Sequence, residues 1–193
     1  MTRKVVVFCG PSGVGKGTIE SILFKKPELK LKLSVSATSR SPRDREKNGV
    51  HYFFISQEDF KKKIKNNEFL EWSKHFENYY GTLKSQIREI SNAGFIPFLE
   101  IETNGAKQVI DINNATGDFD LITIFLHAPD MKELERRIRG RNTETDEVIL
   151  QRLEKAKKEI GESIIFQYHV INHTPEQAAT EIEKIILSHG KEE

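Results

Sequence analysis

The chain has 193 residues, a formal net charge of +1 and a single cysteine, Cys9. This length suits one domain, the charge gives no overall attraction to nucleic acid or to a membrane surface, and the cysteine count excludes an intrachain disulfide or a cysteine-rich zinc site. No apolar run approaches the roughly 18 residues of a membrane span, and the N-terminus has no signal-peptide core, so we expect a cytoplasmic protein.

Short apolar runs alternate with amphipathic helical patterns along most of the chain. Two helix starts carry capping signals, Ser56-x-x-Asp59 and Thr174-Pro175-x-Gln177. This alternation predicts an α/β fold with a parallel sheet covered by helices on both faces. In chain order the pattern predicts strands at 5–9, 31–35, 50–55, 69–72, 95–101, 121–126 and 170–171, and helices at 18–25, 56–65, 83–93, 130–139, 147–160 and from 175 onward.

Two stretches interrupt the alternation. Residues 37–84 carry more strand signal than helix signal and include four tyrosine or tryptophan residues, which indicates an inserted mixed α/β subdomain. Residues 139–147 are polar throughout and lie between two predicted helices, as in a mobile lid. We therefore expect a single domain whose core comprises 1–36, 85–138 and 148–193, with the insert at 37–84 and the lid at 139–147.

The strongest motif follows directly on the first predicted strand. It is the phosphate-loop pattern G-x-x-x-x-G-K, carried by Gly10-Pro11-Ser12-Gly13-Val14-Gly15-Lys16-Gly17-Thr18. Glycines let successive backbone N–H groups point at phosphate oxygens, Lys16 adds a positive charge, and the following helix directs its N-terminus at the same anion. A hydroxyl normally follows the lysine as a magnesium ligand; here Gly17 stands there, which leaves Thr18 as the candidate. The alternative is a glycine-rich turn without a ligand.

A second cluster of candidate residues lies in the insert. Arg40 and Arg43 stand three residues apart among hydroxyl side chains, and two such guanidinium groups can fork onto a phosphate. The alternative is an exposed charged loop in which neighbouring carboxylates, including Glu46, occupy the arginines. Further along, Tyr80 and Thr82 flank a glycine in a predicted loop, where a tyrosine hydroxyl could bond phosphate or the ring could simply pack.

Carboxylates form a third set of candidates. Glu71 lies in the apolar segment 69–72, where it needs either a cation or a ligand with two N–H donors. Glu100 and Glu102 alternate with apolar residues at the end of a predicted strand and therefore share a face, at the edge where open α/β sheets bind ligands. They could hold hydrated Mg²⁺ or accept hydrogen bonds from a ligand; structural salt bridges are the alternative.

Arginines bracket the polar segment 139–147. Arg137, Arg141 and Arg152 could surround a phosphoryl group during transfer, when charge spreads over its oxygens, and a closing lid would exclude water. An isolated arginine-rich helix is usually only solvated, but the phosphate loop upstream favours the phosphoryl interpretation.

Taken together, these segments resemble the guanylate kinases, in order and across nearly the whole chain. The resemblance implies a P-loop kinase that transfers the γ-phosphoryl group of ATP to GMP or dGMP with Mg²⁺. We expect such a protein to bind neither nucleic acid nor a membrane. The matching pieces are 10–18, Ser34-Val-Ser36, Thr38-x-Arg40-x-Pro-Arg43, Glu46, Asn48-Gly49, Tyr52-Phe-Phe, Glu68-Phe-Leu-Glu71, Asn78-Tyr-Tyr-Gly-Thr82, Glu100-Ile-Glu102, Gly105, Arg137, Gly140-Arg141, Thr143-Glu-Thr, Arg152 and Asn172.

The family's site residues carry over as follows. The GMP phosphate site would be formed by Arg40, Arg43, Tyr52 and Tyr80, with Glu46 beside them. Guanine would be recognised by Ser36, Glu71 and Thr82, with help from Glu100. ATP would lie on residues 10–18 with Asn172 near the adenine. The transferred phosphoryl group would be surrounded by Lys16, Arg137, Arg141 and Arg152. The metal would be held by Thr18 and Glu102, directly or through water.

Some positions depart from the family pattern. Glu100 and Glu102 stand where the family usually has aspartate, which adds one methylene to each contact, and Arg45 replaces a usual glycine. Two competing hypotheses remain: a non-catalytic guanylate-kinase-like module that binds phosphorylated peptides, and a kinase for another nucleoside monophosphate. The intact phosphate loop argues against the first, and the insert with Glu71 and Thr82 argues against the second.

Overall fold

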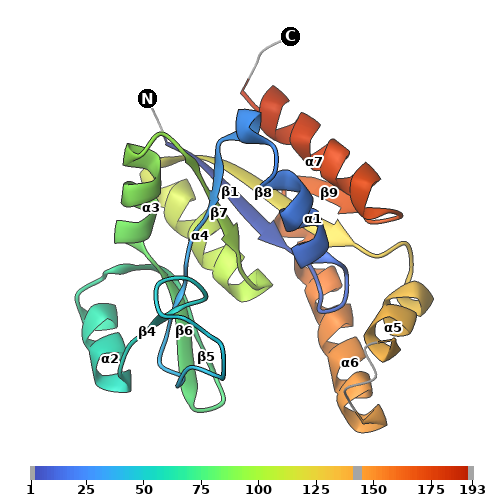
Figure 1. Cartoon of the computed structure of the whole chain (residues 1–193), viewed down its shortest axis with the longest axis horizontal. Helices are drawn as coiled ribbons and strands as arrows, with labels where there is room; N and C mark the ends of the chain where they lie inside the picture. The colour runs from blue at the N-terminus through green and yellow to red at the C-terminus, as the bar shows by residue number, and fades with distance from the viewer. Residues whose placement is uncertain (1–2, 141–144, 191–193) are drawn as a thin grey trace.

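The computed structural model describes residues 3–140 and 145–190. Its larger sheet has five parallel strands in the order β2-β7-β1-β8-β9, with β1 at the centre (Figure 1). Parallel neighbours need crossover connections, which the helices supply, and this confirms the predicted fold class. The strands are β1 (Arg3–Cys9), β2 (Leu31–Leu33), β7 (Ile96–Glu100), β8 (Phe119–His127) and β9 (Tyr168–Ile171).

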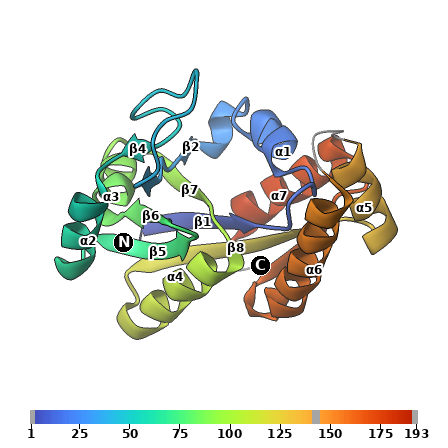
Figure 2. The ribbon, with the colours of Figure 1, turned by 90° about the horizontal axis from the view of Figure 1, so that it is seen from below.

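Helices cover both faces of this sheet, as the apolar pattern predicts. Figure 2 shows α1 and α7 on one side of the central strands and α4 on the other. The helices are α1 (Lys16–Leu23), α2 (Gln57–Lys65), α3 (Lys84–Asn92), α4 (Thr103–Thr116), α5 (Met131–Arg139), α6 (Asp146–Glu162) and α7 (Pro175–Ser188), with short 3₁₀ turns at Pro27–Leu29 and Ser163–Ile165. Among the described residues, no helix is both long and apolar enough to span a membrane.

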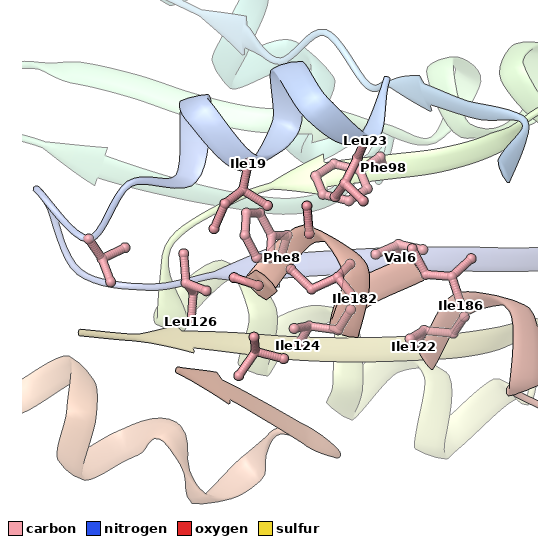
Figure 3. Packing of buried hydrophobic residues seen from close by; sticks show 14 of the residues in the cluster. Val6, Phe8, Ile19, Leu23, Phe98, Ile122, Ile124, Leu126, Ile182 and Ile186 are labelled. Atoms are coloured by element: carbon pink, nitrogen blue, oxygen red, sulfur yellow. The ribbon is translucent and has the colours of Figure 1, made fainter. Parts of the chain in front are cut away.

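Alternation along β1 builds two apolar layers from one strand. Val6 and Phe8 point to the layer that contains Ile19 of α1 and Ile182 of α7 (Figure 3). Val5 and its alternate neighbours point to the opposite layer, with apolar residues of α3 and α4. Because the central strand is buried on both faces, its carboxyl end is held rigidly where the phosphate loop begins.

A second, four-stranded sheet is built from residues 37–83 and has mixed strand directions. It corrects two sequence expectations. The predicted strand at 50–55 shrinks to two residues, and residues 78–82, expected to be a loop, form a strand that pairs antiparallel with its predecessor. Gly81 permits this close pairing, because a Cβ there would lie 2.7 Å from the Glu71 carbonyl oxygen. The strands are β3 (Ala37–Thr38), β4 (Phe53–Phe54), β5 (Phe69–His75) and β6 (Asn78–Leu83).

Helix α4 lies in a stretch for which the sequence predicts no element. Its glycine, threonines and asparagines are weak helix formers, and its buried residues, Ala106 and Val109 among them, are few. Tertiary packing of that short apolar stripe decides the conformation. By contrast, both predicted caps are present: the Ser56 and Thr174 hydroxyls accept hydrogen bonds from the backbone N–H groups of Asp59 and Gln177.

Candidate active site

Two cavities, of about 440 and 690 Å³, join at the carboxyl ends of β1 and β7. The smaller reaches the phosphate loop at Gly10, Ser12 and Lys16, and the larger extends into the inserted subdomain. The site therefore runs from the core to the insert without a break. The residues common to both cavities are Tyr52, Glu100, Ile101, Glu102, Arg152 and Lys155.

The phosphate loop depends on its glycines. Gly15 has a φ of 104°, in the left-handed region, and a Cβ there would lie 2.6 Å from the Asn172 side-chain nitrogen. Lys16 follows as the first residue of α1, two residues before the predicted start. Its ammonium group donates to the carbonyl oxygen of Gly10 at 2.6 Å and lies 3.8 Å from a Glu100 oxygen. The lysine is thus folded along the loop, beside the cavity.

Two predicted residues contact the phosphate loop: Asn172, expected near the adenine, and Arg137, expected beside the transferred phosphoryl group. The Asn172 amide donates to the Val14 carbonyl oxygen at 2.8 Å and is buried. The Arg137 guanidinium donates to the carbonyl oxygens of Val14 at 3.2 Å and Asn172 at 3.0 Å, and pairs with Glu133 at 2.7 Å. Both side chains therefore fix the loop's backbone in this structure.

Glu20 is a buried carboxyl of the loop helix that the sequence analysis missed. Its Oε1 is buried without a hydrogen-bond partner among the described residues. Burial raises the pKa of Glu20 to about 7, and the adjacent charge of Glu100 adds to this, while Lys16 acts in the opposite direction. The spacing of Lys16 and Glu20, four residues apart on one helix, was the available signal.

We expect Glu20→Gln to raise the melting temperature at about pH 8 by about 2–4 °C, which corresponds to roughly 1 kcal/mol in a domain of this size. The folded-state pKa of about 7 lies above the ordinary 4.5, so stability is lost as the pH rises through 7, when the buried carboxyl must ionise. The amide avoids that cost. At about pH 5 the carboxyl is already neutral when folded, so the gain should be smaller. Thermal unfolding at both pH values, with exposed Glu28→Gln as control, measures this; equal gains would contradict it.

The insert end of the site presents arginine and tyrosine side chains to the larger cavity. Arg40 forms a bidentate pair with Glu46 at 2.9 and 3.0 Å and hydrogen-bonds Tyr80. The hydrogen bonds from Arg40 are the largest cause that lowers the pKa of Glu46 to about 2. The Arg43 backbone N–H, which donates to Glu46 at 2.7 Å, is the next. The Tyr52 and Tyr80 rings lie 6.1 Å apart. Glu46 thus orients this arginine cluster.

A buried carboxylate, Glu71, lines the larger cavity. The Thr82 hydroxyl donates to Glu71 Oε1 at 2.6 Å, and the Thr82 backbone N–H donates as well. Burial raises the pKa of Glu71, against the lowering effect of the Thr82 bonds. A Cβ at Gly105 would lie 2.6 Å from Glu71 Oε2, so only glycine leaves room beside that oxygen. Ser36 lines the same cavity.

Charged side chains meet where the two cavities join. Glu102 contacts Lys155 at 2.7 Å and His75 at 3.2 Å, which links α6 to the hairpin of the insert. Arg152 donates to the Ser12 hydroxyl at 2.6 Å. His75 and Lys155 were not predicted, although Lys155 stands one helical turn after Arg152 and so shares its face. Residue 141, and with it the predicted Arg141 contact, lies outside the described residues.

The comparisons with known proteins agree with this geometry. Residues 2–189 match the family model described as guanylate kinase. The chain belongs to the guanylate kinase family. The guanylate kinase of Mycoplasmopsis pulmonis (strain UAB CTIP) is 56% identical over 185 residues, covering 96% of this chain and 94% of that protein. That of Mycoplasmopsis synoviae (strain 53) is 50% identical over 186 residues, covering 95% and 94%. The crystal structure of guanylate kinase from Anaplasma phagocytophilum aligns with a TM-score of 0.75 at 26% identity, covering 99% of this chain and 88% of that one.

One departure from the guanylate kinase pattern is visible in the backbone. Arg45 occupies the position where the family usually has glycine, and it adopts a φ of 72°. The left-handed turn is therefore kept by an arginine, at a backbone cost that glycine would not carry. The turn still presents Glu46 to Arg40, so the substitution leaves the arginine cluster in place.

The oxygen-bearing side chains at the site suit a Mg²⁺ ion that is held mainly by nucleotide phosphates. Mg²⁺ in such sites takes one or two protein oxygens and keeps water or phosphate in the remaining positions. Glu100 and Glu102 line both cavities, and Thr18 is exposed on the first turn of α1. The part of the chain that the structure describes contains no ready-made group of three His, Cys, Asp or Glu ligands.

Proposed function

We propose that the chain is a guanylate kinase that transfers the γ-phosphoryl group of ATP to GMP or dGMP, giving GDP or dGDP and ADP. The observation that carries this is the pair of adjoining cavities: one is lined by the phosphate loop, and the other by an arginine–tyrosine cluster and a buried carboxylate. An acceptor phosphate on that cluster would face a donor phosphate on the loop.

The acceptor phosphate is proposed to bind Arg40, Arg43, Tyr52 and Tyr80. Guanidinium forks match phosphate oxygens, and the tyrosine hydroxyls add hydrogen bonds without adding charge. Glu46 acts on the arginines: its bidentate contact fixes the plane of the Arg40 guanidinium. We propose that Glu46 contributes to GMP binding through this orientation.

Guanine is proposed to lie against Ser36, Glu71 and Thr82, with Glu100 at the side toward the core. Guanine presents N1–H and N2–H₂ as adjacent donors, and Glu71 Oε2 lies next to Gly105, whereas the Thr82 hydroxyl bonds Oε1. A donor pair and a carboxylate complement each other, so the buried carboxylate would gain hydrogen bonds beyond those that Thr82 donates.

ATP is proposed to bind with its phosphates on the backbone of residues 10–18, with Asn172 acting through the loop that its amide supports. Lys16, Arg137, Arg141 and Arg152 are the proposed cations around the transferred group. Mg²⁺, held by Thr18 and by Glu102 directly or through water, would neutralise phosphate charge. Phosphoryl transfer to an anionic phosphate oxygen needs no protein nucleophile, so these residues act by position and charge.

A coupled assay of ADP formation tests the proposal. With ATP and Mg²⁺ present, we expect GMP and dGMP to support turnover and AMP, CMP and UMP to support far less. Faster turnover with another monophosphate would make the chain a kinase of that nucleotide. No turnover with any of them, together with binding of a phosphorylated peptide, would favour the non-catalytic module.

We expect Arg152→Ala to lower kcat by about 10- to 100-fold while the Kd for GMP changes by less than about twofold, because a cation beside the phosphate loop acts where charge develops. Arg152 lies at the junction of the cavities and contacts Ser12 of the loop. Steady-state kinetics and calorimetry with GMP measure the two effects. Lys158→Ala, on an exposed face of the same helix, is the control. Weak GMP binding at unchanged kcat would assign Arg152 to the acceptor pocket.

A further inference from the structure

Another cavity, of about 680 Å³, shares no lining residue with the active-site cavities. Arg3 is the first residue of β1, and its partner Phe119 is the first residue of β8. The cavity therefore lies at the amino ends of strands whose carboxyl ends carry the active site. Helix α3 supplies one wall through Lys84, Ile87 and Arg88, which share one helix face.

Positive charge in this cavity is largely uncompensated. Arg3, Lys84 and Arg88 line it, against the single carboxylate of Asp118. The side chains of Arg3 and Arg88 form no ion pair or hydrogen bond with any residue in 3–140 or 145–190. Within residues 3–140 and 145–190, the Lys84 ammonium group donates only to the Asn67 side-chain oxygen, at 3.0 Å.

Four other arginines among the described residues differ from this pair. Arg40, Arg136, Arg137 and Arg139 all pair with carboxylates. Arg43, at the proposed GMP phosphate site, resembles the pair in this cavity because its guanidinium has no carboxylate within 4 Å among the described residues. Unpaired guanidinium groups thus occur at a proposed anion site as well as in this second cavity.

The cavity also has an apolar side. Leu70 and Ile87 are buried beneath it, and Ile112 and Phe119 are partly exposed along it. Its volume falls within the range of small-molecule sites, roughly 300–1,000 Å³, and exceeds what a bare phosphate would fill. Cations above an apolar floor suit a ligand that is charged at one end and flat and apolar at the other.

We propose that this cavity is a second ligand site, for a small organic phosphate with a planar apolar body. The body would lie on the apolar floor, and the phosphate would face the cations and lie away from Asp118. Arginine suits this role because its planar fork matches phosphate oxygens. Asn67 and Leu70 belong to the insert and Arg3 and Phe119 to the core, so an occupant would touch both.

The test uses 1-naphthyl phosphate as the probe and isothermal titration calorimetry as the measurement. Saturating GMP and a non-hydrolysable ATP analogue first fill the active site. The variant is Arg3→Gln/Arg88→Gln, whose side chains are exposed and unpaired; the matched control is Lys61→Gln/Lys132→Gln, which removes two exposed cations elsewhere. Inorganic phosphate and 1-naphthol are titrated separately, as the charged and apolar parts alone.

We expect saturable binding of the probe to the wild type and at least about tenfold weaker binding to the arginine variant, equivalent to about 1.4 kcal/mol. The control variant should stay within about twofold of wild type, and both variants should keep wild-type turnover without the probe. Absence of binding to the wild type, or equal binding to the arginine variant, would overturn the site. If inorganic phosphate bound as tightly as 1-naphthyl phosphate, the proposed recognition of an apolar body would be wrong. If 1-naphthol bound as tightly, the proposed recognition of a phosphate would be wrong.

Discussion

Lys16→Ala is expected to lower kcat by at least about 10²-fold, because a fixed positive charge beside the transferred phosphates is lost where transition-state charge develops. In the structure Lys16 lines the smaller cavity, and its ammonium group donates to the Gly10 carbonyl oxygen at 2.6 Å.

The GMP site supplies an internal control for this variant. Its proposed contacts lie in the insert, so the Kd for GMP should change by less than about twofold, and the far-ultraviolet circular dichroism should match the wild type. Lys132→Ala, an exposed lysine of α5, controls for loss of one positive charge. A folded Lys16→Ala protein with near wild-type kcat would show that the loop acts through its backbone N–H groups alone.

Local sequence signals account for most of the core. Buried parallel strands need continuous apolar runs, as in Val5–Cys9, and caps such as Ser56 and Thr174 mark helix starts through a single hydrogen bond. Helix α4 and strand β6 lack such signals. Each is set by what it packs against: α4 by the sheet face, β6 by its pairing with β5 through a tight turn from His75 to Asn78.

Some residues of the site are likewise recognisable in the sequence, whereas others are identified only by the fold. Residues 10–18 form a contiguous motif, so the sequence displays them together, and Glu71 draws attention as a carboxylate in an apolar strand. The roles of Glu20 and Lys155 depend on neighbours far along the chain: Glu20 meets Glu100, and Lys155 meets Glu102. Only the topology, which brings α1 and α6 to the end of β7, places Lys155 in the site and Glu20 beside Glu100.

Glu71→Gln is expected to lower kcat/KM for GMP by about 10²-fold or more and to narrow the ratio of kcat/KM for GMP to that for AMP. The amide keeps the size of the side chain but replaces one acceptor oxygen with an NH₂ donor, which at the proposed site would face the guanine N–H donors. Adenine presents an N1 lone pair and no N2 amino group, so we expect the wild-type carboxylate to reject it. An unpaired buried polar group costs about 1–3 kcal/mol, and sites built to bond a polar edge reject a ligand lacking it by roughly 10⁴-fold.

The surroundings of Glu71 determine the assay pH and the control variants. Burial raises the pKa of Glu71, so the assay is run at about pH 8 to favour the ionised carboxylate. Glu68→Gln is the matched control, because Glu68 lies in the same segment and pairs with Lys63 at 2.8 Å outside the cavity. Thr82→Val tests whether Thr82 holds the Glu71 carboxylate in place, because it removes the 2.6 Å hydrogen bond from the hydroxyl to Glu71. We expect it to raise KM for GMP more than it lowers kcat. An unchanged GMP-to-AMP ratio in Glu71→Gln would make Glu71 a structural carboxylate and move guanine recognition to Glu100 or Thr82.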